Sequence, residues 1–536
     1  MGGARTRGNG GDLLLRGGVV ADGTGAEPKA MDVLLDAERI VAVEQPGVIP
    51  ERGYEVSDLH GLVLAPGFID VHSHADNAPL LDDDDTTKIL QGVTTEVVGN
   101  CGFSLAPVAA EREQDLVSLT RRIFPPLSWG WSSFGDLLDE LDGRGYVTNY
   151  APLVGHGTLR LAVAGFEARA TTPAERDRMA QLAAAAVEAG AVGMSTGLIY
   201  PPGLFGDTDE IAAVMERLPD GCIYATHMRG EGAHLQASIA EALEIGRRSG
   251  KAVQISHLKA AGRQNWGGVP RALEQLAEAR ADGVRVTQDV YPYTASSTML
   301  TACLPPWFQE GGHHAVMARL ADTGTRARLR KEIEAGSTDD WENHVTGAGW
   351  DGILVSSTGS HRHEGQTLTE IAEELDVDPF DALVGVLQEE QLQVSMVVFG
   401  MCEDDLEAAL RDPHTMIGSD GLPPGTGGKP HPRLFGTFPR VLARYVRERK
   451  VLDLGTAVHK MTGLPAATFG FTDRGRIAPG MVADLVALDP ERVSDQGDYR
   501  DPVHPPTGIA WVMQGGGVVV ENGRWLGVRR GRRLSS

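Results

Sequence analysis

Cysteine, long apolar runs and positive charge are all scarce in this sequence of 536 residues. The chain has only 4 cysteines, and they are widely separated, which is not the pattern of a disulfide framework. No apolar run approaches the roughly 18 residues that a membrane-spanning helix needs, and the first residues lack the apolar segment of a signal peptide. We therefore expect a protein of a reducing, cytoplasmic setting without a membrane partner.

The charge balance excludes a further class of partner. Acidic residues number 73 against 49 basic ones, which gives a net charge of −24. Apart from "RRGRR" near the C-terminus, which we expect to be a frayed end, there is no basic stripe. Nucleic acid is therefore not expected to bind. Nothing in the composition predicts the oligomeric state.

The hydrophobic pattern divides the chain into two kinds of segment. Residues 1–64 and 475–536 contain short strand-like runs broken by Gly, Asp and Pro, so we expect these two flanks to pair into one small domain. Residues 65–474 alternate strand-like runs with helical patterns such as "PAERDRMAQLAAAAVEAG". Such alternation over this length predicts an α/β fold, a barrel of eight parallel strands covered by helices.

The central segment contains more strand-like runs than such a barrel can use. Ten candidates compete for eight places, so some must belong to an insertion. Residues near 298–350 show no clear strand and are expected to form part of it. Its tryptophans, Trp307, Trp341 and Trp350, could form a lid over the barrel mouth or simply pack the insertion against the barrel.

Residues that bind metals or transfer protons recur where the strand-like runs end. In chain order they are His72, His74, Cys101, His227, His257 and Asp420. Taken singly, each has an ordinary structural explanation, such as a buried small thiol, a strand-end imidazole or a helix-capping carboxylate. In a βα barrel, however, the carboxyl ends of all strands open on one face. Together these residues therefore predict a metal site at the mouth of the barrel.

The ligand types indicate which metal the site would take. Imidazole and thiolate favour Zn²⁺, whereas Mg²⁺ and Ca²⁺ prefer oxygen ligands. Cys101, His227 and His257 would supply three ligands and leave a fourth position for water, as in catalytic zinc sites. His72 and His74 project from the same face of a strand and could hold a second, adjacent metal.

The same residues suggest a reaction. Zinc lowers the pKa of bound water toward ~7 and polarises a substrate carbonyl. Asp420 could then accept the proton of the water and pass it to a leaving nitrogen, acting as general base and acid.

Several motifs together resemble one enzyme family. They are "GFIDVHSHAD", "GVTTEVVGNCGFS", "GLIYPPG", "YATHMRGE", "QISHLKAAGRQNWG", "DVYPYTASST", "GSDG" and "HPRLFGTFPR". In this combination the sequence resembles the amidohydrolase superfamily, and more closely its N-acyl-D-amino-acid deacylase (D-aminoacylase) branch, from about residue 12 to 525. The resemblance implies a TIM barrel, with a small β-sandwich domain made from both chain ends.

The resemblance also implies roles for the residues at the strand ends. The family has one tightly bound zinc ion, a weaker second metal position that the thiolate can bridge, and one catalytic acid/base. The matching residues are Cys101, His227 and His257 for the tight zinc, His72 and His74 for the second position, and Asp420 for the acid/base.

The implied substrate is a small anionic amide, so a protein of this charge needs local positive groups to bind it. Lys259, Tyr291, Ser297 and Arg433 match the family's carboxylate-binding positions, and Tyr200 matches a position that contacts the substrate carbonyl. A bidentate arginine suits a carboxylate geometrically. From the sequence alone, Arg433 could equally form a surface salt bridge, and Tyr200 could pack beneath a proline turn.

A missing residue type separates this branch from its neighbours. Dihydroorotases and hydantoinases usually bridge two metals with a carboxylated lysine of a mid-barrel strand. This chain has no lysine between Lys88 and Lys251, which favours linear over cyclic amides.

The leading hypothesis is therefore zinc-dependent hydrolysis of N-acyl-D-amino acids to a carboxylate and a free D-amino acid. The preference for the D form rests on the resemblance alone. The alternatives are a cyclic amide, a peptide with a D residue or a specialised natural-product amide at the same site, and a catalytically silent scaffold.

Overall fold

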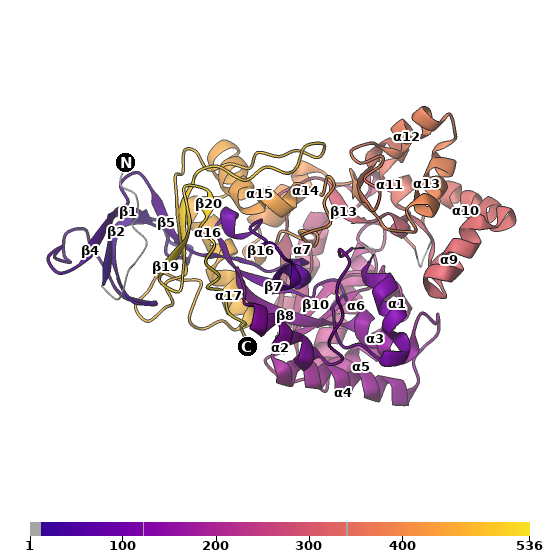
Figure 1. Ribbon diagram of the computed structural model, residues 1–536, viewed down its shortest axis with the longest axis horizontal. Helices are drawn as coiled ribbons and strands as arrows, with labels where there is room; N and C mark the ends of the chain where they lie inside the picture. Colours follow the sequence, from indigo (N-terminus) through magenta and orange to yellow (C-terminus); the bar gives the residue numbers. More distant parts are fainter. Residues whose placement is uncertain (1–11, 122, 339–340, 536) are drawn as a thin grey trace.

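The computed structural model describes residues 12–121, 123–338 and 341–535, and its centre is a barrel of parallel strands (Figure 1). In spatial order these strands are β6 (Phe68–Asp70), β7 (Val93–Val98), β8 (Asn149–Gly155), β9 (Gly193–Gly197), β10 (Ile223–His227), β11 (Ala252–Ile255), β12 (Val286–Val290) and β16 (Thr415–Ile417). A parallel bridge between Ser73 and Gly421 joins the first strand to the last. The predicted α/β barrel is confirmed.

Helices surround the barrel, as the alternating sequence pattern predicts. They are α1 (Glu113–Thr120), α2 (Phe134–Arg144), α3 (His156–Ala164), α4 (Pro173–Ala189), α5 (Thr208–Met215), α6 (Leu235–Ser249), α7 (Val269–Ala281), α14 (Glu403–Arg411), α15 (Arg433–Arg440), α16 (Leu454–Met461) and α17 (Gly463–Phe469). Helix α4 shows why these boundaries are readable. Thr172 and Glu175 form a reciprocal capping box at its start, and Gly190 follows its last residue.

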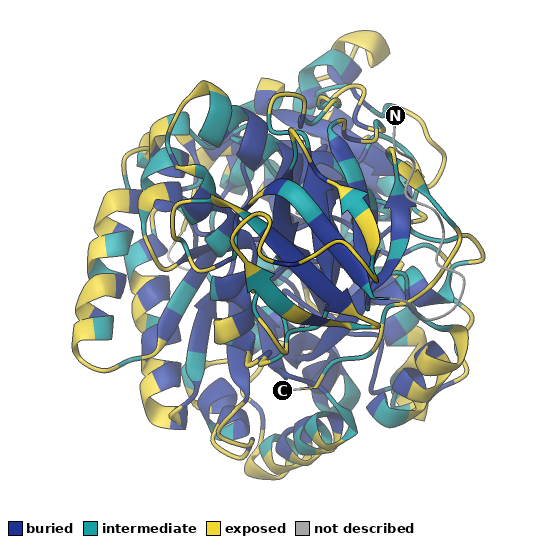
Figure 2. Cartoon of the chain, turned by 90° about the vertical axis from the view of Figure 1, so that its left-hand side faces the viewer, coloured by how far each residue is buried: buried dark blue, intermediate teal, exposed yellow. Residues whose placement is uncertain are grey.

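The two chain ends form a second domain at one end of the molecule. Its strands are β1 (Leu13–Val20), β2 (Lys29–Asp36), β3 (Arg39–Glu44), β4 (Glu55–Asp58), β5 (Val63–Pro66), β17 (Leu485–Leu488), β18 (Ile509–Gln514), β19 (Gly517–Glu521) and β20 (Arg524–Trp525). They share one nine-stranded sheet, because β17 pairs antiparallel with β5. Figure 2, viewed onto this domain, shows buried strands beneath more exposed loops. Leu15, Leu64, Leu485 and Trp511 from both ends share one core, so the two flanks pack together.

The surplus strand-like runs form a separate unit between β12 and β16. Its three-stranded antiparallel sheet consists of β13 (Ser296–Met299), β15 (Val394–Val398) and β14 (Ile353–Thr358). Its helices are α8 (Pro306–Gln309), α9 (Gly312–Ala321), α10 (Thr323–Ala335), α11 (His344–Ala348), α12 (Leu368–Leu375) and α13 (Pro379–Glu389).

This unit has a hydrophobic core of its own and lies at the opposite end of the molecule from the second domain (Figure 1). Trp341 belongs to that core, and Trp307 and Trp350 pack against it. The strands "GILVSS" and "SMVVFG" lie in its sheet, which accounts for two of the ten candidates and extends the unit beyond residue 350.

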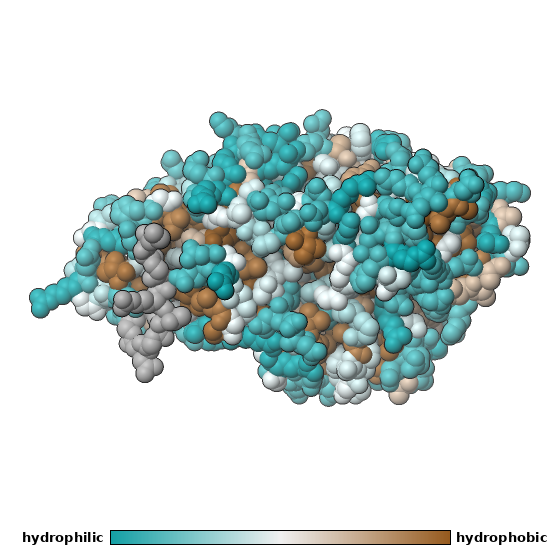
Figure 3. All heavy atoms as spheres, turned by 45° about the horizontal axis from the view of Figure 1, so that its top comes forward, coloured by the Kyte–Doolittle hydropathy of each residue, from teal (hydrophilic) through white to brown (hydrophobic). Residues whose placement is uncertain are grey.

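The expectation that the basic C-terminal run is frayed is wrong. Arg529 pairs with Asp84 at 2.6 Å, and Arg532 pairs with Glu38 at 2.6 Å. Gly531 also forms a bridge with Tyr146. These arginines therefore neutralise acidic groups of the protein itself. The face of the molecule drawn in Figure 3 is largely hydrophilic. None of the helices in the described part of the chain is long and apolar enough to cross a membrane.

A fully buried lysine holds together the seam at which the barrel closes. The Nζ atom of Lys88 lies 3.0 Å from Asp70 Oδ2 and 3.2 Å from Glu96 Oε2, and it donates to Ser73 Oγ at 3.0 Å. Across the seam, Asp70 accepts the Ser419 backbone N–H at 2.8 Å and its hydroxyl at 2.6 Å. These groups are excluded from water, so the cation and its two carboxylates depend on one another.

We predict that Lys88→Met lowers the free energy of unfolding by about 3–5 kcal/mol, because it leaves two buried carboxylates without their cation. Thermal or urea denaturation of the purified variant measures this loss. Lys29→Met removes an exposed lysine and serves as the matched control. A Lys88→Met protein as stable as the control would show that the seam does not depend on this charge.

Candidate metal centre and substrate pocket

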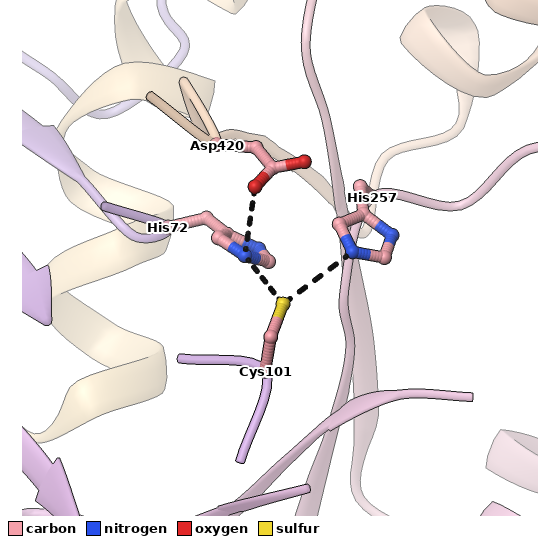
Figure 4. A group of neighbouring side chains, drawn as sticks. All are labelled: His72, Cys101, His257 and Asp420. Carbon is pink, nitrogen blue, oxygen red and sulfur yellow. Dashed lines mark hydrogen bonds and ion pairs between the residues drawn. The ribbon is translucent and has the colours of Figure 1, made fainter. Parts of the chain in front are cut away.

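The structure brings the six polar strand-end residues together at the carboxyl end of the barrel. Figure 4 shows four of them, His72, Cys101, His257 and Asp420, pointing toward a common centre. Their ligand atoms all lie within 4.8 Å of one another, and all four residues are buried. His227, Glu231 and His257 form a second group by the same criterion. The two groups share His257 and so form one continuous cluster.

Three of these residues adopt an unusual backbone conformation. Cys101, His257 and Asp420 have φ values of 54°, 35° and 48°, in the left-handed region that side chains other than glycine rarely occupy. Such a conformation costs on the order of 1–3 kcal/mol per residue and persists only where the surrounding structure imposes it. Here the chain turns sharply at the end of each strand and directs the side chain toward the barrel axis.

The distances around Cys101 suit a tetrahedral metal ion. Its sulfur lies 3.7 Å from His227 Nδ1, 3.7 Å from His257 Nε2 and 3.4 Å from His72 Nε2. Tetrahedral zinc with bonds of about 2.3 Å to sulfur and 2.0–2.1 Å to nitrogen separates its ligands by roughly 3.6 Å. The donor set and its spacing therefore fit a zinc ion without rearrangement.

The second predicted metal position, at His72 and His74, faces the same aspartate. Asp420 Oδ1 lies 3.2 Å from His74 Nε2 and 3.5 Å from His72 Nε2. The other ring nitrogen of His74 has no hydrogen-bond partner among the described residues.

Two carboxylates behind the histidines were missed in the sequence. Asp289 accepts the backbone N–H of His257 at 2.9 Å and lies 3.4 Å from His72 Nδ1. Glu231 lies 2.8 Å from His257 Nδ1 and 2.5 Å from the Nζ atom of Lys259. Such outer partners orient metal-binding imidazoles. Asp289 ends a strand-like run as the recognised residues do, and Glu231 follows His227 by one helical turn's spacing, so both carried a readable signal.

Electrostatics favour the ionised forms of the thiol and the central carboxyl. Burial opposes ionisation of Cys101, but the neighbouring His72 and hydrogen bonds from imidazoles hold the pKa of its thiol well below the usual range. Burial likewise opposes ionisation of Asp420, yet the guanidinium of Arg433 and the nearby histidines hold the pKa of that carboxyl well below its usual range. Asp420 is therefore a carboxylate at neutral pH.

The predicted substrate-binding residues line the same pocket or stand directly behind it. Lys259, Tyr291, Ser297 and Tyr200 are in its wall. Arg433 is completely buried and lies 2.9 Å from Asp420 Oδ2, so the alternative of a surface salt bridge is wrong.

Two of the three predicted hydroxyl groups, those of Ser297 and Tyr200, differ in their present hydrogen bonding. The Ser297 Oγ atom has no hydrogen-bond partner among the described residues. The Tyr200 hydroxyl lies 2.7 Å from Thr298 Oγ1, and the Tyr200 ring packs edge-on against His227.

Part of the lining of this pocket is apolar. Phe103, Ile123, Ile199, Met299 and Leu422 contribute to it. The free space, including the mouth that opens to solvent, is about 580 Å³. The lining thus offers charged and hydrogen-bonding groups beside the donor cluster, and also apolar surface.

Known proteins are similar to this chain along almost its whole length. A family model described as the amidohydrolase family matches residues 55–519. The chain is 38% identical to the D-aminoacylase of Alcaligenes xylosoxydans xylosoxydans over 527 residues, which cover 98% of this chain and 97% of that protein. It is 37% identical over 526 residues to the N-acyl-D-aspartate deacylase of the same organism, covering 97% and 93%.

A solved structure agrees with these similarities. The N-acyl-D-glutamate deacylase from Bordetella bronchiseptica, complexed with zinc and a phosphonate inhibitor, superposes with a TM-score of 0.82 at 33% identity, covering 98% of this chain and 99% of that one. The barrel and its cluster of metal donors are thus those of a metal-dependent amidohydrolase. Within that class, the chain belongs to the N-acyl-D-amino-acid deacylase, or D-aminoacylase, family.

The charged groups around Glu231 should make the stability of the metal-free protein depend on pH. Burial acts to raise the pKa of Glu231, but Lys259 and the two histidines beside it hold that pKa well below its usual range. A lowered folded-state pKa stabilises the protein above the unfolded pKa, and this contribution disappears as the pH falls through the folded value.

Glu231→Gln should therefore lower the melting temperature at neutral pH, and the deficit should shrink below about pH 4.5. Melting curves of the chelator-treated protein across pH measure it. Glu244→Gln, an exposed change on α6, is the control. A deficit that does not change with pH would contradict the charge-based explanation.

Proposed function

We propose that this protein hydrolyses the amide bond of N-acyl-D-amino acids, releasing a carboxylate and a free D-amino acid. The observation that carries the proposal is the convergence of Cys101, His227 and His257 beside the ionised Asp420 in one buried pocket. The similarity to the D-aminoacylase of Alcaligenes xylosoxydans xylosoxydans, over nearly the whole of both chains, supports the choice of substrate class.

Zinc is the metal that these donors would hold. Cys101, His227 and His257 would bind one ion tightly, and His72 and His74, next to Cys101, would hold a second ion more weakly. When bound, zinc supplies Lewis-acid activation of a water molecule and of the substrate carbonyl. The lowered pKa of the Cys101 thiol supports this assignment, because a thiolate and not a thiol is the ligand.

Asp420 would move the proton. As a carboxylate it can accept the proton of the attacking water, and the resulting acid can give that proton to the leaving nitrogen when the C–N bond breaks. Its Oδ2 atom is held by Arg433 at 2.9 Å, which fixes the carboxylate plane. Its Oδ1 atom faces His72 and His74.

The pocket walls would orient the substrate. Burial and the neighbouring Cys101 raise the pKa of Tyr200 well above its usual value, so its hydroxyl stays protonated and can donate to the acyl carbonyl. Ser297 Oγ and the Tyr291 hydroxyl would receive the carboxylate. The only hydrogen bond of the Tyr291 hydroxyl among the described residues is to Met401 Sδ at 3.6 Å. Lys259 and Arg433 would contribute positive charge.

The apolar wall suggests the side chain of the preferred amino acid. Phe103, Ile123, Ile199 and Leu422 offer no charge to an acidic side chain. Aliphatic or thioether side chains would remove apolar surface from water there, at about 25 cal/mol per Å². We therefore assign the protein to N-acyl derivatives of apolar D-amino acids, such as D-leucine or D-methionine.

The proposed function predicts a preference for one stereoisomer and for one kind of amino-acid side chain in the substrate. Zinc-loaded protein should hydrolyse N-acetyl-D-leucine and N-acetyl-D-methionine in preference to their L forms and to N-acetyl-D-aspartate. Chiral chromatography of the released amino acid measures the rates. Equal turnover of D and L forms would contradict the proposal. No turnover of either series would redirect the search to cyclic amides, peptides with a D residue or specialised natural-product amides.

The proposed function also predicts the effect of replacing Asp420, the proposed general base and acid. Asp420→Asn should lower kcat by at least roughly 10²–10⁴-fold, because an amide cannot accept the proton of water. Bound zinc, measured by elemental analysis, should be retained. Asp404→Asn, an exposed change, controls for the loss of a charge. An Asp420→Asn enzyme with a normal rate would rule out this mechanism.

A further inference from the structure

His344 is a polar group of the reaction pocket to which neither the sequence nor the proposed mechanism assigns a role. It is the first residue of α11 in the inserted unit, and it lines the pocket together with Glu231, Lys259 and Ser297. Its side chain is only partly buried. In the part of the chain that the structure describes, no residue forms a hydrogen bond with its ring, so the imidazole faces the pocket uncommitted.

The backbone that carries His344 is held firmly against the metal centre. The carboxylate of Glu342 accepts the backbone N–H groups of Glu231 at 2.8 Å, Gly232 at 2.8 Å and His234 at 3.1 Å. Asn343 caps α11 through the Thr346 N–H at 3.2 Å. The inserted unit and the loop after β10 are therefore fixed together, and His344 is presented to the pocket from a rigid support.

The cations expected to bind the substrate carboxylate are already engaged by the protein. Lys259 Nζ lies 2.5 Å from Glu231 Oε1 and 2.8 Å from His257 Nδ1. Arg433 lies 2.9 Å from Asp420 and donates to the Ser297 carbonyl at 3.1 Å. Each cation is thus partly neutralised by a carboxylate, and an incoming anion needs donors that are not shared.

His344 meets that need. Desolvation inside the pocket, together with the neighbouring His227 and Lys259, lowers the pKa of His344 to about 4, so at neutral pH the ring is uncharged and carries one N–H donor. A neutral donor directs the anion without adding another positive charge beside the metal ligands. Its location supports this role, because His344 and Met401 line one adjoining cavity and Met401 contacts the Tyr291 hydroxyl.

We propose that His344 is a specificity-determining residue that donates a hydrogen bond to the carboxylate of the bound substrate. This inference rests on the proposed function, because it presupposes an N-acyl amino acid in the pocket. It assigns to the inserted unit a direct part in selecting free carboxylates over neutral amides.

The test compares an acid with its uncharged analogue. His344→Ala should raise KM for N-acetyl-D-methionine roughly tenfold or more, as expected for a lost hydrogen bond to a charged group. It should leave kcat and zinc content nearly unchanged. The inhibition constant of N-acetyl-D-methioninamide, which lacks the carboxylate, should change little. His344→Asn retains an N–H donor and should recover part of the loss, and Thr346→Ala on the same helix is the exposed control.

Each other result overturns the inference. An unchanged KM would show that His344 does not contact the substrate. An equal loss of affinity for the acid and for the amide would show that His344 contacts a part of the substrate other than the carboxylate. A melting temperature lowered by His344→Ala but not by Thr346→Ala would indicate a structural role. A wild-type enzyme inactive on every N-acyl-D-amino acid would remove the proposed function together with this inference. If the wild type turns over N-acetyl-D-methionine and the His344→Ala variant has the same KM, the inference about His344 is wrong while the proposed function stands.

Discussion

The buried charge of Lys88 is the constraint on which the active centre depends, because it lies where the barrel closes on itself. Asp70 and Glu96 share this cation on one side, and Asp70 also accepts both donors of Ser419 from the other. His72 and His74, which follow the first strand, meet Asp420, which follows the last strand, across this seam. The backbone N–H of Asp420 donates to the carbonyl of the first of these histidines at 2.7 Å. A shift of the seam would therefore move the two histidines away from Asp420.

Cys101, His257 and Asp420 have a left-handed backbone conformation, and the surrounding barrel must stabilise this strain. Each conformation is unfavourable by itself, and a relaxed strand end would turn these side chains away from the axis. The strain is offset by fixed partners. Asp289 holds the backbone N–H of His257 at 2.9 Å, while the strand-to-strand contacts of the seam hold Asp420. Rigid positions for the donors reduce the rearrangement needed to bind a metal ion.

The sequence allowed the barrel and its donor cluster to be predicted, because both follow local rules. Strand periodicity marks each run, and polar residues at strand ends such as His227 and Cys101 must share one face. The partnerships that span the chain could not be predicted. Arg532 meets Glu38, and Lys88 meets Asp70, only because folding brings distant segments together. The bounds of the insertion were also unreadable, since its buried strands have the same apolar pattern as those of the barrel.

The charge balance of the pocket links metal binding to substrate binding. Lys259 is paired with Glu231 and Arg433 with Asp420, so these four groups together carry no net charge. Burial opposes protonation of His72 and His74, but the Cys101 thiolate and Asp420 raise the pKa of both imidazoles, so the thiolate is balanced as well. A divalent ion on the donors would displace the protons of these imidazoles, so metal and protons compete for the same atoms. The proposed anionic substrate would then meet a pocket whose cations are already paired. Neutral donors on the walls can then orient the anion without competing for the metal's ligands.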